Sequence, residues 1–147
     1  MIVLDAFAVV AFLLGEPAAK DVARLLNGDD EVTLTALGLA EVVDRMVRGA
    51  GVPADDVVLD LAELGLADPP AISADVTLQA GLLRSRHYHR TRCAVSLADC
   101  VVVATALARN ASVATSDPHL LDVCHAEGVS VVVLPDTAGQ RWRPPRR

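Results

Sequence analysis

The sequence predicts an α/β protein in which helices cover a mainly parallel β-sheet. Strand-like apolar runs alternate along the chain with segments of helical periodicity, which is the order that parallel sheets require. The composition suits such a core, since 52% of the 147 residues are hydrophobic and Ala, Val and Leu dominate. A chain of this length is most simply one domain.

The first half of the chain contains two predicted strands and four predicted helices. The first strand is an apolar run that ends at Asp5, and the second alternates apolar and polar residues. Pro17 and Pro53 stand at the start of helical segments, where proline is tolerated. The strands are predicted at 1–5 and 31–35, and the helices at 6–14, 17–27, 37–49 and 53–66.

The second half continues the alternation. The segment that begins at Ser96 strongly predicts a helix, and Pro118 begins another predicted helix directly after a strand. Residues 87–95 are predicted to form a loop. The strands are predicted at 70–73, 112–117 and 129–135, the first of them short, and the helices at 74–86, 96–110 and 118–128.

The apolar run of residues 1–14 does not predict a membrane segment. It is too short to span a bilayer, it contains Asp5, and no basic residues precede it. We therefore expect a soluble, cytoplasmic protein with no membrane partner.

The three cysteines, Cys93, Cys100 and Cys124, are odd in number and lack CxxC spacing. We therefore expect buried, inert thiols and no zinc site.

Basic residues are concentrated in two segments of a chain whose net charge is −6. "RSRHYHRTR" (84–92) contains four arginines and the only tyrosine, and "RWRPPRR" (141–147) contains four more and the only tryptophan. These segments fit either a solvated helix end and a frayed tail, or two surfaces for an anionic partner.

Four acidic residues suit a site at one edge of the predicted sheet. Asp5 ends the first strand, and Asp117 ends the strand that precedes Pro118. Asp99 lies in the first turn of a helix, and Glu41 lies in the helix after the second strand. In parallel α/β sheets, ligands bind beyond the carboxyl ends of the strands, where these acids are expected.

Three of these acids also fit local structural roles. Asp117 fits the N-cap of the helix that follows, and Asp99 fits a capping box with Ser96. Glu41 stands four residues before Arg45, the spacing of an exposed helical ion pair. Asp5 has the weakest structural alternative, because its flanks are apolar on both sides and a buried carboxylate needs a partner.

Carboxylates that are brought to one place repel each other. At ~4 Å and an effective dielectric of ~20, one pair costs about 4 kcal/mol before solvent and protonation relieve it. A divalent cation makes such a cluster favourable, and ligands that are all oxygen select Mg²⁺ or Mn²⁺. Other α/β folds that use magnesium or bind nucleotides require motifs that this chain lacks. It has only one lysine, no D-x-D after its first strand, no P-loop and no GxGxxG.

Four segments of the chain, in this order, carry a family resemblance: "MIVLDAFAVVAFLL", "LGLAEVV", "SLADCVVVATALA" and "ATSDPHLL". They resemble the PIN-domain ribonucleases and, among these, the VapC toxins of bacterial toxin–antitoxin pairs, in which the motifs have the same order. The resemblance implies a three-layer α/β/α sandwich around a mainly parallel sheet. It also implies a PIN-like catalytic domain over residues 1–135, with an Arg- and Pro-rich tail over 136–147 that inherits nothing.

The resemblance further implies a metal-dependent endoribonuclease that cuts single-stranded or loop RNA. Its acidic quartet, which would bind Mg²⁺ or Mn²⁺, is Asp5, Glu41, Asp99 and Asp117. Thr115 and Ser116 match hydroxyl positions that support the last acid. The family's proteins are usually homodimers that a cognate VapB-type antitoxin inhibits, and they meet DNA only through that antitoxin.

RNA is expected to contact the first basic segment. The residues assigned to this contact are Arg84, Arg86, Arg90, Arg92 and Tyr88, the last available for base stacking. The same arginines fit an acidic antitoxin or operator DNA. The sequence departs from the family at Phe7, where a small polar residue is frequent, and this favours the alternative of a non-catalytic PIN-fold module that binds RNA or antitoxin.

Overall fold

A computed structural model, which describes residues 1–144, contains one parallel β-sheet of four strands. The strands are β1 (Ile2–Leu4), β2 (Val32–Thr33), β3 (Ser112–Thr115) and β4 (Val131–Val133), in the spatial order β2-β1-β3-β4. Ile2 pairs with Val32 on one side and with Ser112 on the other. All three pairings are parallel, which confirms the predicted sheet.

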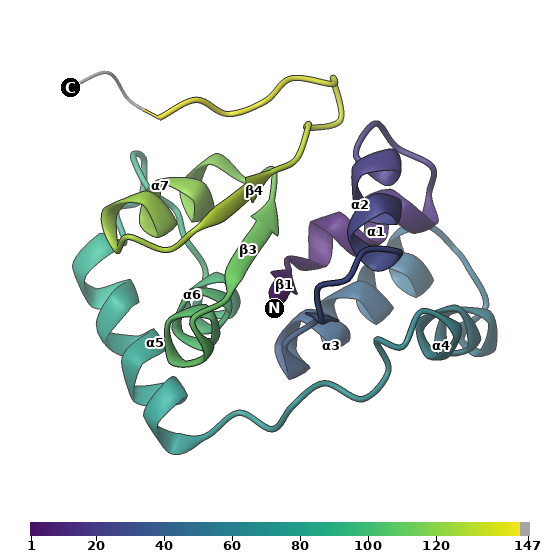
Figure 1. Cartoon of the computed structure of the whole chain (residues 1–147), viewed down its shortest axis with the longest axis horizontal. Helices are drawn as coiled ribbons and strands as arrows, with labels where there is room; N and C mark the ends of the chain where they lie inside the picture. Colours follow the sequence, from purple (N-terminus) through teal and green to yellow (C-terminus); the bar gives the residue numbers. More distant parts are fainter. Residues whose placement is uncertain (145–147) are drawn as a thin grey trace.

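Helices form a layer on each side of the sheet, so the architecture is the expected α/β/α sandwich (Figure 1). One layer contains α1 (Ala6–Leu13), α2 (Ala19–Leu26), α3 (Ala36–Asp44) and α4 (Ala54–Glu63). The other contains α5 (Ala74–His87), α6 (Leu97–Arg109) and α7 (Pro118–Ala126). Within residues 1–144, no helix is long and apolar enough to cross a membrane.

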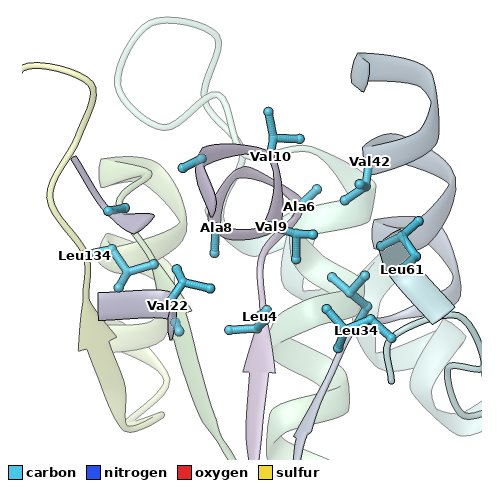
Figure 2. Packing of buried hydrophobic residues seen from close by; sticks show 14 of the residues in the cluster. Leu4, Ala6, Ala8, Val9, Val10, Val22, Leu34, Val42, Leu61 and Leu134 are labelled. Carbon is cyan, nitrogen blue, oxygen red and sulfur yellow. The ribbon is translucent and has the colours of Figure 1, made fainter. Parts of the chain in front are cut away.

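Successive residues of the strands point into different cores, because side chains alternate across a sheet. Leu4 packs with the α1–α4 layer, while Val3 packs with the α5–α7 layer. Figure 2 shows Leu4 beneath Val9 of α1, with Leu134 and Leu34 on opposite sides. Each fully buried leucine or valine of this kind stabilises the fold by about 1.5–3 kcal/mol.

The predicted strand at 70–73 is wrong. These residues form an irregular connection that ends at Ser73, whose Oγ accepts a hydrogen bond from Val76 N (3.2 Å) and caps α5. Pro69 and Pro70 explain the error, because proline has no backbone N–H to donate to a neighbouring strand.

Two helices differ from their predicted bounds. The helix predicted over 37–49 is α3 followed by a π-helical segment, η1 (Arg45–Gly49), and Gly51 then turns the chain with a φ of +71°. The helix predicted from residue 17 begins at Ala19, because Pro17 belongs to the preceding turn. The other predicted strands and helices are present, with strands shorter than the apolar runs suggested.

The segment predicted as a loop contains a tight turn between α5 and α6. His89 N donates to Cys93 O (2.8 Å) and Cys93 N donates to His89 O (3.0 Å). All three cysteines are free thiols, and Cys100 and Cys124 are buried as expected, whereas Cys93 is only partly buried. The last three residues of the predicted tail, 145–147, lie outside the described residues.

Candidate metal and active site

The carboxyl ends of β1 and β3 bring two acidic residues to the same edge of the sheet. Asp5 directly follows β1, and its backbone N donates to Ala114 O of β3 (3.0 Å). Thr115 is the last residue of β3, and Asp117 follows two residues later. The first turn of α6, which contains Asp99, lies near this edge, since α6 packs against β1 and the charge of Asp99 acts on Asp5.

Asp5 is a buried acid, with 7% of its surface exposed. Its Oδ2 accepts a hydrogen bond from Thr115 Oγ1 (2.9 Å). Burial is the main cause that raises the pKa of Asp5 to about 7; the charges of Asp99, Glu41 and Asp117 contribute to the rise, and the Thr115 hydroxyl opposes it. Three of the predicted acids therefore lie close enough to Asp5 for their charges to raise its pKa.

Thr115 joins two of these acids through one hydroxyl. It donates to Asp5, and its Oγ1 accepts a hydrogen bond from the backbone N of Asp117 (3.0 Å). Ser116, the other predicted supporting hydroxyl, makes no side-chain hydrogen bond within residues 1–144. Of the two, only Thr115 is placed to fix the carboxylates.

The other three acids each make the local contact that the sequence suggested as an alternative. Asp117 Oδ1 caps α7 by accepting from the backbone N of His119 (2.7 Å) and of Leu120 (3.1 Å). Asp99 Oδ2 accepts from Ser96 N (2.8 Å) in a capping box.

Glu41 is half-buried, with 32% of its side chain exposed, and is thus more accessible than Asp5. Its Oε1 lies 2.6 Å from Arg45 Nη2 in the expected i,i+4 ion pair. In all four acids these contacts involve one carboxylate oxygen only, so the second oxygen of each has no hydrogen-bond partner among the described residues.

Within residues 1–144, no group of three or more acidic, His or Cys side chains is gathered tightly enough to hold a metal ion. Glu41, Asp99 and Asp117 each direct one oxygen to a group of their own helix or its cap. The donor set nevertheless fits a hard divalent cation, because all its atoms are carboxylate oxygens. A cation would also favour the charged form of Asp5, which burial and three like charges disfavour.

Phe7 is partly buried and packs against the core of the α1–α4 layer. It therefore offers Asp5 no polar contact, as the departure from the family's pattern suggested. The hydroxyl of Thr115, more than a hundred positions away, supplies that contact instead.

Of the residues assigned to RNA, two arginines are used within the fold. Arg84 Nε donates to Val95 O (3.3 Å) and its guanidinium lies 4.1 Å from the centre of the Tyr88 ring. Arg86 pairs with Glu127 (3.1 Å).

Arg90 and Arg92 are exposed and make no side-chain hydrogen bond or ion pair within the part of the chain that the structure describes. They flank the tip of the turn between His89 and Cys93. This turn lies beside the acids, since burial and then the charges of Asp122, Asp117 and Asp99 raise the pKa of the Cys93 thiol.

Comparison with known proteins places this geometry in a family. The PIN domain model matches residues 2–126. The fold is similar to a chain in the crystal structure of FitAcB from Neisseria gonorrhoeae, with a TM-score of 0.62 and 24% identity over 89% of this chain and 96% of that one. It is also similar to a chain of VapBC2 from Rickettsia felis bound to a DNA fragment from their promoter, with a TM-score of 0.60 and 18% identity over 90% and 98%.

No curated protein gave a significant match.

The raised pKa of Asp5 predicts how stability depends on pH without metal. Between the ordinary value of 3.8 and about 7, the unfolded chain releases this proton while the folded chain keeps it, so the free energy of unfolding falls as pH rises. The fall is expected to reach as much as about 4 kcal/mol. Urea unfolding in chelator across this range should show it, and Asp5→Asn should flatten it. Equal slopes for both proteins would contradict the assignment.

Thr115→Val should remove one donor from Asp5 and one acceptor from Asp117 N without changing the side-chain volume greatly. We expect the unfolding free energy to fall by about 1–3 kcal/mol at neutral pH. The Asp5 pKa should rise further, because the hydroxyl favours the charged carboxylate. Carboxyl NMR titration of Asp5 measures this shift, with Thr115→Ser as the control that keeps the hydroxyl. An unchanged pKa in the valine variant would show that the contact is incidental.

Proposed function

We propose that this chain, which belongs to the PIN domain family, is a Mg²⁺- or Mn²⁺-dependent endoribonuclease. PIN domains are generally nucleases, which supports a hydrolase role. The observation that carries the proposal is the buried Asp5, whose pKa three neighbouring acids help to raise to about 7. We assign catalysis to residues 1–135 and none to the tail over 136–147.

The proposed reaction is hydrolysis of a phosphodiester bond in single-stranded or loop RNA. Water attacks phosphorus in line with the leaving 3′-oxygen, so the products carry a 5′-phosphate and a 3′-hydroxyl. When bound, a divalent cation supplies stabilisation for the charge on the phosphate and activates water as the nucleophile. No serine or histidine nucleophile is required.

The residues proposed to hold the cation are Asp5, Glu41, Asp99 and Asp117. Thr115 keeps Asp5 Oδ2 occupied and leaves Oδ1 without a hydrogen-bond partner among the described residues. Capping interactions fix the backbone at Asp99 and Asp117, because each acid anchors the first turn of its helix. The exposed Arg90 and Arg92 are proposed to bind phosphates near the site.

We also propose that the chain is the toxin of a VapBC-type pair that acts in the cytoplasm. Support comes from its fold, which resembles chains of FitAcB and VapBC2. A cognate VapB-type antitoxin and a homodimer are part of this proposal, and any contact with DNA would be through the antitoxin.

One observation favours the competing function of a non-catalytic module that binds RNA or antitoxin. Glu41, Asp99 and Asp117 are held by local contacts, and no metal-holding group is already assembled among residues 1–144. Incubating the purified protein with total RNA and Mn²⁺, with and without chelator, separates the two. RNA binding without metal-dependent cutting would favour the module, and cutting that survives chelator would count against the metal mechanism.

Asp99→Asn should reduce cleavage at least ~100-fold, because it removes one of the charges proposed to hold the cation. The melting temperature in chelator should be unchanged or higher, since an asparagine oxygen still accepts the capping hydrogen bond and one like charge is removed. Asp75→Asn is the matched control, as Asp75 lies in the first turn of neighbouring α5. A sharp fall in melting temperature with retained cleavage would show that Asp99 serves only as a structural helix cap.

Glu41→Gln should also lower cleavage, and Asp44→Asn should leave it unchanged. The two acids are a matched pair, because each bonds an arginine four residues later, Arg45 and Arg48 respectively. Of the two, only Glu41 has a charge that acts on Asp5. Initial cleavage rates of the two variants, measured side by side, test this assignment. Equal effects of the two substitutions would show that Glu41 serves only in a surface ion pair.

A further inference from the structure

We propose that Trp142 and Arg143 of the C-terminal tail form one surface along α7 together with the turn at residues 89–93, and that this surface binds the phosphates of single-stranded RNA. This inference rests on the proposed function, because it names where the substrate lies beside the acidic site. The two basic segments are far apart in the sequence, and the fold brings both to the same helix.

The first part of the tail, residues 136–141, is folded back on the domain. Asp136 Oδ1 accepts hydrogen bonds from Ala138 N (2.9 Å) and Gln140 N (2.8 Å), which closes a tight turn after β4. Arg141 then pairs with Asp21 of α2 (2.5 Å) and also donates to Val133 O. Arg141, the first residue of the second basic segment, is therefore held against β4 and α2, which disfavours the alternative of a tail that is frayed from residue 141.

Trp142 fixes the next residue on α7. Its Nε1 donates to Asp122 Oδ1 (3.0 Å), and its ring meets His125 edge-on at a centroid distance of 6.1 Å. Asp122 and His125 are three residues apart, so they share one face of the helix. Figure 1 shows the yellow C-terminal chain passing along the α7 side of the molecule. Arg143 follows directly and is exposed.

The turn at residues 89–93 reaches the other end of α7. Cys93 Sγ contacts His119 O (3.9 Å) in the first turn of the helix. His89 Nδ1 accepts from the backbone N of Arg92 (3.2 Å), which fixes the tip that carries Arg90 and Arg92. The turn and the tail thus contact successive turns of one helix whose N-cap is Asp117.

The charges on this side of the molecule favour an anionic partner. Two nearby acids are paired with cationic side chains, since Asp21 pairs with Arg141, and Glu127 pairs with Arg86 and His87. Asp122 has the neutral N–H of Trp142 as its hydrogen-bond partner and no ion-pair partner among residues 1–144, so its charge opposes an anion there. The three arginines Arg90, Arg92 and Arg143 have no ion-pair partner within residues 1–144. They are left to bind an anion supplied from outside.

An exposed aromatic ring selects RNA over an acidic peptide as that anion. Tyr88 is 45% exposed and adjoins the turn, with Arg84 against its ring. Proteins that bind single strands combine cationic side chains for phosphates with aromatic rings for bases. The same arrangement lies next to the acids proposed to cut the strand.

The test is the binding of labelled oligouridine and oligoadenosine to the full chain, by fluorescence anisotropy in chelator over a range of KCl concentrations. For single strands, the slope of log K against log salt falls in magnitude by about 0.7 for each phosphate that the protein no longer neutralises. We expect that fall for Arg143→Ala and about twice that fall for the double variant Arg90→Ala/Arg92→Ala. Both RNAs should be affected equally, because phosphate contacts carry no sequence information.

Arg109→Ala is the matched control. Arg109 is exposed at the far end of α6, about 15 Å from Asp99 along the helix axis at 1.5 Å per residue, and should leave the slope unchanged. Trp142→Ala should remove most of the contribution of Arg143 to the salt dependence of RNA binding. The double variant Trp142→Ala/Arg143→Ala should therefore have nearly the same slope as Trp142→Ala alone. Unchanged melting temperatures of the arginine variants show that the fold is intact.

Two results would contradict the proposed RNA-binding surface. One is equal behaviour of Arg143→Ala and Arg109→Ala while the wild-type chain cuts RNA, which would leave the proposed function standing. The other is weaker binding of a polyglutamate peptide by Arg143→Ala with no change for RNA. If the wild-type chain binds RNA with the expected arginine dependence but does not cut it in Mn²⁺, the surface is supported and the nuclease proposal fails.

Discussion

The burial of Asp5 among like charges is the constraint on which the rest of the site depends. A carboxylate that is 7% exposed and adjoins buried Leu4 and Ala6 is costly to charge, and Asp99, Glu41 and Asp117 add to that cost. Among the described residues, Thr115 is the side chain that donates a hydrogen bond to Asp5. The apolar layers contribute the stability that tolerates this arrangement. Protonation of Asp5 relieves the repulsion below about pH 7, and a bound cation would relieve it with the carboxylate charged.

The parallel sheet explains why distant residues meet at Asp5. Strands β1 and β3 are neighbours and run in the same direction, so the residues after them share an edge. Helix capping then places Asp117 and Asp99 at helix N-termini, where the helix dipole favours negative charge. The capping role of these acids is therefore compatible with the proposed binding of a cation, because a cap uses one oxygen of each carboxylate.

Much of the fold was predictable from the sequence, and the failures have physical causes. The strand ending at Asp5 and the helix starting at Ser96 are local patterns, and both are present. The strand predicted at 70–73 is absent because Pro69 and Pro70 outweigh the apolar residues beside them. Two contacts join residues that are distant in the sequence. Thr115 donates a hydrogen bond to Asp5, and Trp142 donates one to Asp122 of α7. No local pattern reports such contacts, and the same holds for the use of Arg84 and Arg86 inside the fold.

The four acids are proposed to form a divalent-cation site around Asp5. Calorimetric titration of Mn²⁺ in buffers of different ionisation enthalpy near pH 6 tests this most directly, because it measures binding and proton release together. We predict that binding releases protons, that the release declines as the pH is raised above about 7, and that Asp5→Asn abolishes the release. Absence of Mn²⁺ binding, or binding whose proton release is the same in wild type and Asp5→Asn, would contradict it.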